Sequence, residues 1–236
     1  MPARSRATTS EQPLPERLHE IGVVPVVALP DADTALPLIE ALLAGGIGCA
    51  EITFRTTAAT EALPLLRQRF PELLLGAGTV LTVAQADQAI DAGAQFVVAP
   101  GTNPAIVEHV LARGVPMLPG VATPSEIEAA LARGLDVVKF FPAEPFGGIA
   151  TLQAFAGPYP QVRYVPTGGI SASNLAAYLA LPTVLACGGS WMVSRDLLAA
   201  RDFATITRLA AEATAIVRSV RGAESDRASG APGTRP

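Results

Sequence analysis

Lysine is nearly absent from this sequence of 236 residues: Lys139 is the only one, and arginine supplies the other sixteen of its 17 basic side chains. An arginine stays protonated throughout the physiological pH range, whereas a lysine in an apolar setting can lose its proton and act as a nucleophilic amine. Lys139 lies inside the apolar run 137–141. A lysine that merely extends to water over its apolar stem also fits such a run, so the place of Lys139 in the fold decides between the two interpretations.

Histidine and cysteine are also scarce, with two of each. His19 and His109 have no second ligand at a metal-binding spacing, so we expect no metal site and no other cofactor. Cys49 and Cys187 lie in apolar segments far apart in the chain, which is typical of two small core residues in a reducing compartment rather than of a disulfide. The expected location is therefore the cytoplasm.

The chain has no run of basic residues and no apolar stretch long enough to span a bilayer, and its first seventeen residues lack the hydrophobic segment of a secretory signal. Its formal net charge is −4. A protein with this charge and no basic patch is not expected to bind nucleic acid or an anionic membrane. We therefore expect its ligands to be small anions.

Half of the residues are hydrophobic, and they form short β-branched runs that alternate with helical stretches rich in Ala and Leu. Eight runs predict strands, at residues 23–29, 49–54, 73–77, 95–99, 115–118, 136–140, 162–166 and 183–186. An eightfold repeat of this kind predicts an α/β fold, a single-domain (β/α)8 TIM barrel. An open doubly wound sheet is the alternative, but no G-x-G-x-x-G motif follows the first run. The barrel is expected over residues 14–221, between disordered tails at 1–13 and 222–236.

Helix boundaries are marked by start and stop residues. Thr82 and Thr123 are each followed three residues later by Gln or Glu, which predicts capping boxes, and Asn103 precedes a proline, which predicts a capped helix start. Glycines at 93, 114 and 134 follow helical runs and predict their ends.

In such a barrel the reaction site lies at the carboxyl ends of the strands. Lys139 lies near the end of the sixth run, and Glu51 and Arg55 lie in and just after the second. Because strand side chains alternate, Lys139 shares a face with Phe141 and is predicted to point into the barrel beside Glu51. A purely structural Glu51–Lys139 ion pair is the alternative, although such pairs are costly to desolvate. A base beside a nucleophilic amine suits Schiff-base chemistry on a carbonyl substrate.

Two glycine turns follow the seventh and eighth runs, at Thr167-Gly168-Gly169 and Gly188-Gly189-Ser190. Loops at these positions commonly bind phosphate, because backbone N–H groups and a helix N-terminus both favour an anion. The planar guanidinium of Arg55 suits a carboxylate, although a solvated arginine is the simpler alternative. Together these groups describe a 2-keto acid with a distal phosphate.

The same residues resemble the 2-keto-3-deoxy-6-phosphogluconate (KDPG) aldolase family, class I aldolases that also act on 4-hydroxy-2-oxoglutarate (KHG). The resemblance covers nearly the whole predicted barrel. It rests on seven ordered motifs, at residues 51–56 (EITFRT), 76–80 (GAGTV), 100–101 (PG), 119–124 (PGVATP), 139–143 (KFFPA), 166–170 (PTGGI) and 188–191 (GGSW).

The resemblance implies that Lys139 is the Schiff-base lysine and Glu51 the general acid/base. It also implies that Arg55 binds the carboxylate of the pyruvyl group, with Thr79 and Pro100 at the same end of the substrate. Further substrate contacts are implied for Phe141, Thr167, Gly168, Gly169, Gly189 and Ser190. The implied reaction is the reversible cleavage of KDPG to pyruvate and D-glyceraldehyde 3-phosphate, in the Entner-Doudoroff pathway and by a homotrimer.

Other functions fit the same residues. A phosphosugar epimerase or isomerase would use Glu51 as a proton shuttle without an imine, and a sensor would bind the keto acid without turnover. The galactonate-derived isomer of the substrate is a further alternative, because the choice at C4 depends on atomic placement around Thr167 and the glycine turns.

Overall fold

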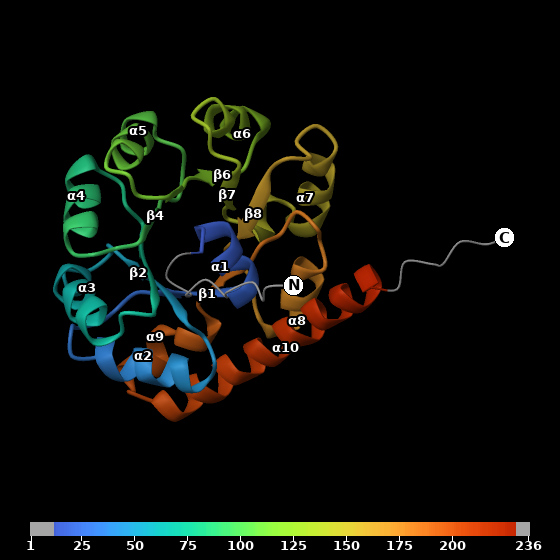
Figure 1. Ribbon diagram of the computed structural model, residues 1–236. Helices are drawn as coiled ribbons and strands as arrows, with labels where there is room; N and C mark the ends of the chain where they lie inside the picture. Colours follow the sequence, from blue (N-terminus) through green and yellow to red (C-terminus); the bar gives the residue numbers. More distant parts are fainter. Residues whose placement is uncertain (1–11, 230–236) are drawn as a thin grey trace, which may run out of the picture.

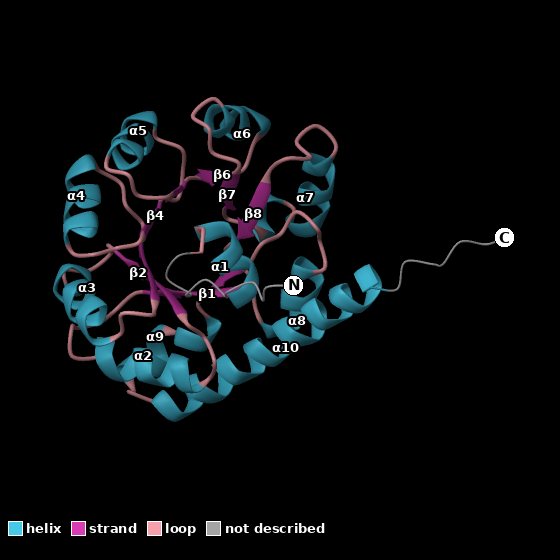
Figure 2. Ribbon diagram, in the orientation of Figure 1, coloured by secondary structure: helices cyan, strands magenta, loops and turns pink. Residues whose placement is uncertain are grey.

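The computed structural model describes residues 12–229, with side chains through residue 223. Its strands form an inner ring and most of its helices surround that ring (Figure 1, Figure 2). The strands are β1 (Val23–Val27), β2 (Cys49–Thr53), β3 (Leu74–Gly78), β4 (Phe96–Val98), β5 (Met117–Leu118), β6 (Gly120–Val121), β7 (Val137–Phe140), β8 (Arg163–Pro166) and β9 (Cys187–Gly189). The α-helices are α1 (Leu14–Ile21), α2 (Ala35–Ala44), α3 (Ala58–Arg69), α4 (Val83–Asp91), α5 (Pro104–Ala112), α6 (Pro124–Leu131), α7 (Gly148–Ala156), α8 (Ala172–Leu179), α9 (Arg195–Ala199) and α10 (Phe203–Ser229), with 3-10 helices η1 (Glu144–Phe146) and η2 (Trp191–Val193).

The strands close into a barrel. The order β5-β4-β3-β2-β1-β9 makes one parallel sheet, and β6-β7-β8 makes a second. Between β5 and β6 stands Pro119, which has no N–H to contribute to a ladder. Parallel bridges from Tyr164 to Val184 and from Thr167 to Gly188 join β8 to the segment that leads through β9. The predicted (β/α)8 barrel is confirmed, and the open sheet is not what forms.

The last strand lies later in the chain than the sequence pattern indicates. The pattern predicts a strand at 183–186, but β9 is Cys187–Gly189, and its ladder with β1 pairs Val23 with Cys187. Glycine has a low intrinsic preference for strands, so the pattern favours the β-branched residues before it. Gly188 is required by packing, because a Cβ there would overlap the Thr167 hydroxyl.

Two hydrophobic cores support the barrel, one between strands and helices and one inside the strand ring. Helix α1 lies over the centre of the ring in Figure 1. Its Leu18 is 1% exposed and packs into the inner core. The other buried members of that core are Val24, Cys49, Leu74, Phe96, Val98, Leu118, Val165 and Ala186. Leu18, Val24, Cys49, Leu74 and Phe96 fill the amino-terminal end of the ring, and the cavity lies toward the carboxyl ends of the strands.

The helices begin at the predicted caps, but the capping box predicted at Thr82 forms only in part, because the Gln85 side chain accepts a hydrogen bond from the Leu81 amide and not from that of Thr82. Thr82 accepts a hydrogen bond from the Gln85 amide at 3.1 Å, and Asn103 caps α5 through the Ala105 amide at 3.1 Å. Thr123 and Glu126 form a complete capping box at α6. The glycines at 93, 114 and 134 have φ of 94°, 72° and 74°, the left-handed conformation of helix ends.

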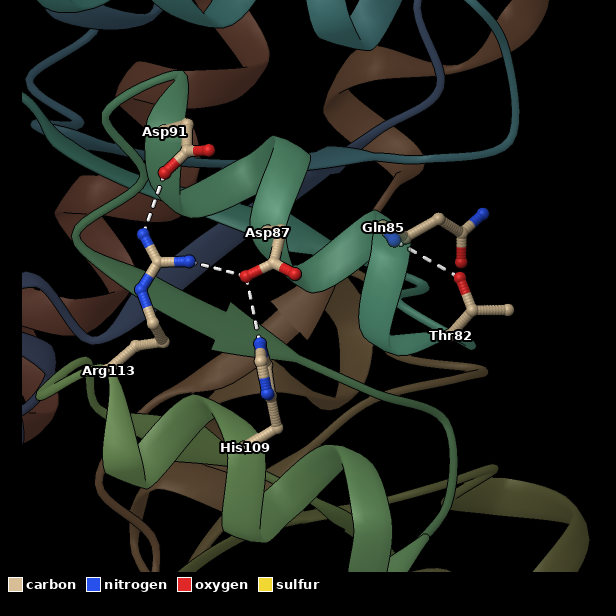
Figure 3. Close-up of polar contacts among 6 residues, drawn as sticks. All are labelled: Thr82, Gln85, Asp87, Asp91, His109 and Arg113. Atoms are coloured by element: carbon tan, nitrogen blue, oxygen red, sulfur yellow. Dashed lines mark hydrogen bonds and ion pairs between the residues drawn. The ribbon is translucent and has the colours of Figure 1, made fainter.

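Neighbouring helices α4 and α5 are also joined by charged side chains (Figure 3). Asp87 of α4 contacts His109 at 2.8 Å and also pairs with Arg113, which in turn reaches Asp91 at 2.7 Å. The network lies on the outside of the barrel, where it joins two consecutive βα units.

The ends of the domain differ in part from expectation. Helix α1 begins at Leu14, where the barrel was expected to start. Helix α10, however, continues to Ser229, whereas a disordered tail was predicted from Gly222. Extending an existing helix costs far less than starting one, so a polar segment that would not nucleate a helix alone can continue α10. Residues 1–11 and 230–236, which fall in the predicted tails, lie outside the described residues. Within residues 12–229 no helix combines the length and apolar character that a membrane crossing requires.

Candidate active site

Lys139 and Glu51 meet inside the barrel. Strand alternation turns Lys139 of β7 and Glu51 of β2 inward, while Val138 and Phe140 pack in the outer core. The Lys139 Nζ lies 3.3 Å from Glu51 Oε1, and the two residues are 6% and 3% exposed. The ring of Phe141 lies with its centroid 5.2 Å from the same Nζ, close enough for a cation–π contact. The snorkelling alternative therefore does not apply, because the amine is buried.

The Glu51 carboxylate needs a glycine beside it on the neighbouring strand β3. Gly78, at the end of β3, is paired in register with Thr53, two residues after Glu51. A Cβ at Gly78 would overlap the Glu51 carboxylate. The absence of a side chain at Gly78 thus makes the space that the carboxylate occupies.

Arg55 and Thr79 form a second polar pair, just beyond the ends of β2 and β3. The Arg55 Nε donates to Thr79 Oγ1 at 3.3 Å. Thr79 has a φ of 57°, which is rare for a β-branched residue and is a form of backbone strain found at functional sites. The strained backbone directs the Thr79 hydroxyl to the guanidinium.

A cavity of about 360 Å3 opens at this end of the barrel. Seven of the residues implied by the resemblance line it, namely Arg55, Phe141, Thr167, Gly168, Gly169, Gly189 and Ser190. Thr79 does not line the cavity but is hydrogen-bonded to Arg55, which does. Lys139 likewise contacts the ring of Phe141, which lines the cavity. Pro100 does not line it but belongs to a separate, more open pocket with Leu81 and Ile106. The structure therefore brings together the predicted site residues except Pro100.

The two glycine turns form one wall of the cavity. Gly168 and Gly169 have φ of 98° and 85°, and within the described residues no hydrogen bond uses either amide as a donor. Ser171 caps α8 in a capping box with Asn174, whose side-chain amide also donates to the Gly169 carbonyl at 2.9 Å. The turn is thereby held with its two amides available to a ligand.

Glu144 holds the Gly168–Gly169 turn in place through its backbone and its side chain. Its amide donates to the Gly168 carbonyl at 3.0 Å, and its carboxylate accepts a hydrogen bond from Tyr178 of α8. Burial and this acceptor raise the pKa of Tyr178. A protonated phenol therefore persists through physiological pH as the donor that holds Glu144.

Sequence analysis missed several residues of the cavity. Val26 and Ala28 of the first βα unit line it, as do Ile170 and Val193, but these are apolar and carry no distinctive signal. Arg195, five residues after Ser190, also lines it. The signal that could have identified it is its charge at the start of the helix that follows the last glycine turn.

The cysteines take no part in the site. Cys49 and Cys187 are free and fully buried, and burial raises the pKa of both thiols, so they remain protonated and inert. Among residues 12–229 no cluster of three or more His, Cys, Asp or Glu side chains is placed to hold a metal ion.

The chain matches a known family model and several characterised relatives. Residues 14–209 match the model of the KDPG and KHG aldolase family. A 2-dehydro-3-deoxy-phosphogluconate aldolase of Treponema pallidum is 56% identical over 202 residues, which cover 86% of this chain and 96% of that protein. The KHG/KDPG aldolase of Escherichia coli K12 is 45% identical over 191 residues, covering 81% and 90%.

Solved structures agree. A KDPG aldolase of Legionella pneumophila, with pyruvate captured as a covalent carbinolamine intermediate, superposes with a TM-score of 0.81 at 41% identity over 84% of this chain and 97% of that one. A KDPG aldolase of Zymomonas mobilis ZM4 with 3-phosphoglycerate gives a TM-score of 0.82 at 40% identity, over 88% and 98%.

Proposed function

The chain belongs to the KDPG and KHG aldolase family, and we propose that it cleaves KDPG to pyruvate and D-glyceraldehyde 3-phosphate through an imine on Lys139. The enzyme is a carbon–carbon lyase of the class I type. The observation that carries the assignment to Lys139 is the 3.3 Å approach of this buried amine to the Glu51 carboxylate. A Schiff base needs a nucleophilic amine held inside the site, and cleavage needs a proton acceptor beside it; the two side chains lie in those positions.

The reaction begins with attack of the neutral Lys139 amine on the C2 carbonyl. The carbinolamine that forms loses water, and the resulting protonated imine withdraws electrons from C3. The proposal is supported by the Legionella relative, in which pyruvate is held as a covalent carbinolamine. Because the imine itself is the electron sink, no metal is required for carbon–carbon cleavage.

Glu51 then acts as the general base. It removes the proton of the C4 hydroxyl, directly or through a water, while the C3–C4 bond breaks and its electron pair passes to the imine as an enamine. D-Glyceraldehyde 3-phosphate leaves. Protonation of the enamine at C3 and addition of water at C2 release pyruvate and regenerate the Lys139 amine.

The two ends of the cavity differ in chemistry, and each suits a different end of the substrate. We propose that Arg55, held by Thr79, binds the carboxylate of the keto acid. Phe141 forms the wall beside the imine, whereas Pro100 lies outside the cavity. Thr167 and the glycine turns bind the hydroxyl and phosphate end, which is supported by the free Gly168 and Gly169 amides.

A second substrate is KHG, which we propose is cleaved to pyruvate and glyoxylate. The E. coli relative is named for both activities. KHG has the same 2-keto-4-hydroxy acid unit as KDPG, so the imine and Glu51 act on it in the same way. Its distal group is a carboxylate, which the same end of the cavity would receive.

We propose further that the enzyme works in the Entner-Doudoroff pathway of the cytoplasm as a homotrimer. An apolar surface around Leu81 and Val83, which are 54% and 37% exposed, supports self-association. Light scattering on the purified protein should give about three times the chain mass of 24.3 kDa, and a monomer mass would contradict the trimer.

Borohydride trapping tests the proposal. Reduction in the presence of pyruvate should leave one stable adduct, at Lys139, and mass spectrometry should locate it. Lys139→Arg should form no adduct and have no aldolase activity. Turnover without any adduct would instead favour an epimerase or isomerase, and tight keto-acid binding without turnover would favour a sensor.

A further inference from the structure

Arg195 is a cationic residue of the cavity for which neither the family resemblance nor the mechanism accounts. It opens α9 and lines the cavity together with Ser190 and Ser194. Within the part of the chain that the structure describes, no carboxylate lies within 4.0 Å of its guanidinium and no hydrogen bond satisfies it. The neighbouring Asp196 does not line the cavity. Arg195 is exposed to solvent, and an unpaired guanidinium at the wall of a cavity can bind an anion that enters it.

The phosphate end of the cavity otherwise has only neutral donors. The glycine turns contribute backbone amides, and Thr167 and Ser190 contribute hydroxyls. A phosphate group that leaves water for such a site loses strong hydration, which partial charges offset less well than a full positive charge does. Of the side chains that line the cavity, only those of Arg55 and Arg195 carry that charge.

The sheet order separates the two arginines. Arg55 follows β2 and Arg195 follows β9, and β1 pairs with both of these strands. Neighbouring strands lie about 4.8 Å apart, so β2 and β9 are separated by about 10 Å at their ends. Val26 and Ala28 line the cavity between them. The two arginines therefore belong to different sides of the cavity, and one anionic group can bind at each side.

We propose that Arg195 binds the distal phosphate and makes the enzyme selective for phosphorylated over unphosphorylated keto acids. The inference rests on the proposed function, because it assigns the second end of the same cavity. Arg55 then binds the carboxylate that all the substrates share, and Arg195 binds the group that distinguishes them.

Steady-state kinetics on KDPG and on its unphosphorylated counterpart, 2-keto-3-deoxygluconate, test this assignment. Arg195→Gln should lower kcat/KM for KDPG by about 10- to 100-fold, mainly through KM, as expected for loss of a charged hydrogen bond. For the unphosphorylated substrate the change should stay within about twofold. Arg195→Lys, which keeps the charge without the planar fork, should lie between wild type and Arg195→Gln.

Arg208→Gln is the matched control, since Arg208 is an exposed residue of α10 that does not line the cavity. It should leave the ratio of the two kcat/KM values at the wild-type value. Inorganic phosphate should inhibit the wild type competitively and Arg195→Gln more weakly.

Equal losses on both substrates, or no loss on KDPG, would overturn the role of Arg195. Borohydride trapping with pyruvate separates this failure from failure of the proposed function. If Lys139 is trapped in both wild type and Arg195→Gln while selectivity is unchanged, only the role of Arg195 is wrong. If the wild type shows no trapping, the imine mechanism itself is wrong.

Discussion

Lys139 and Glu51 are 88 positions apart in the chain, and their side chains meet at 3.3 Å inside the barrel. Strand register creates the meeting, because Glu51 is aligned with Val26 and Gly76, and Lys139 with Gly120 and Val165. A buried ion pair contributes little to stability once its desolvation is counted. The presence of this pair in the centre of the barrel therefore favours a chemical role over a structural one.

Replacing Glu51 by Gln should separate imine formation from cleavage. The amide keeps the shape of the side chain but cannot accept the C4 hydroxyl proton, so cleavage of KDPG should slow by at least about 100-fold. Pyruvate should still be trapped on Lys139 by borohydride. Glu61→Gln on the exposed face of α3 should behave as wild type. If Glu51→Gln weakens only pyruvate binding, Glu51 is not the base.

Replacing Gly78 by alanine should lower catalytic activity, although Gly78 lies on β3 and the catalytic Glu51 on the neighbouring β2. Gly78→Ala places a Cβ on the Glu51 carboxylate, which must move away from Lys139. We expect kcat to fall by at least about tenfold, the scale at which a displaced general base loses its effect. Gly48→Ala is the matched control, because its Cβ would meet no atom within 4 Å. Circular dichroism should show both variants folded, and equal activity of the two would refute the steric argument.

Arg55→Lys should weaken binding of the keto-acid carboxylate. A lysine keeps the positive charge but loses the planar fork and the hydrogen bond to Thr79. The KM for KDPG should rise by about 10- to 100-fold, and the concentration of pyruvate needed for borohydride trapping should rise in parallel. Arg208→Lys should change neither quantity. An unchanged KM in Arg55→Lys would mean that Arg55 is only a solvated arginine.

The Asp87 network should stabilise the fold in a pH-dependent way (Figure 3). Hydrogen bonding to His109 and then the charge of that residue and Arg113 hold the pKa of Asp87 below its usual value. A lowered carboxylate pKa adds stability above the unfolded value of about 3.9, and this stability is lost as pH falls through the folded value. Thermal unfolding should therefore show a lower Tm for Asp87→Asn than for wild type at pH 6.

The difference between Asp87→Asn and wild type should shrink as pH falls below the unfolded value of about 3.9 and vanish only below the lowered folded pKa of Asp87. Glu212→Gln on α10, an exposed carboxylate to which no other described residue gives such a hydrogen bond or ion pair, should show no pH-dependent difference. A Tm difference for Asp87→Asn that stayed constant from pH 6 to pH 3 would point to packing rather than charge.

Local patterns in the sequence predicted much of the fold and many residues of the candidate site. The alternation of β-branched runs with helical stretches predicted the barrel, and Thr82, Asn103 and Thr123 marked helix starts where they occur. These features depend on neighbours three or four residues away, so they can be predicted without knowledge of any long-range contact. The eighth strand was placed too early for the same reason, since Gly188 and Gly189 are poor strand formers locally and are strands only because β1 pairs with them.

What the sequence by itself determined is the set of reactive groups and the strand ends that carry them: one lysine, the acid Glu51, Arg55 and two glycine turns. Only the tertiary structure decided which groups share a space. Closure of the barrel set Lys139 against Glu51, left Pro100 outside the cavity, and brought Arg195 to the cavity wall. Distances between strands depend on register and packing over the whole ring, which no local pattern encodes.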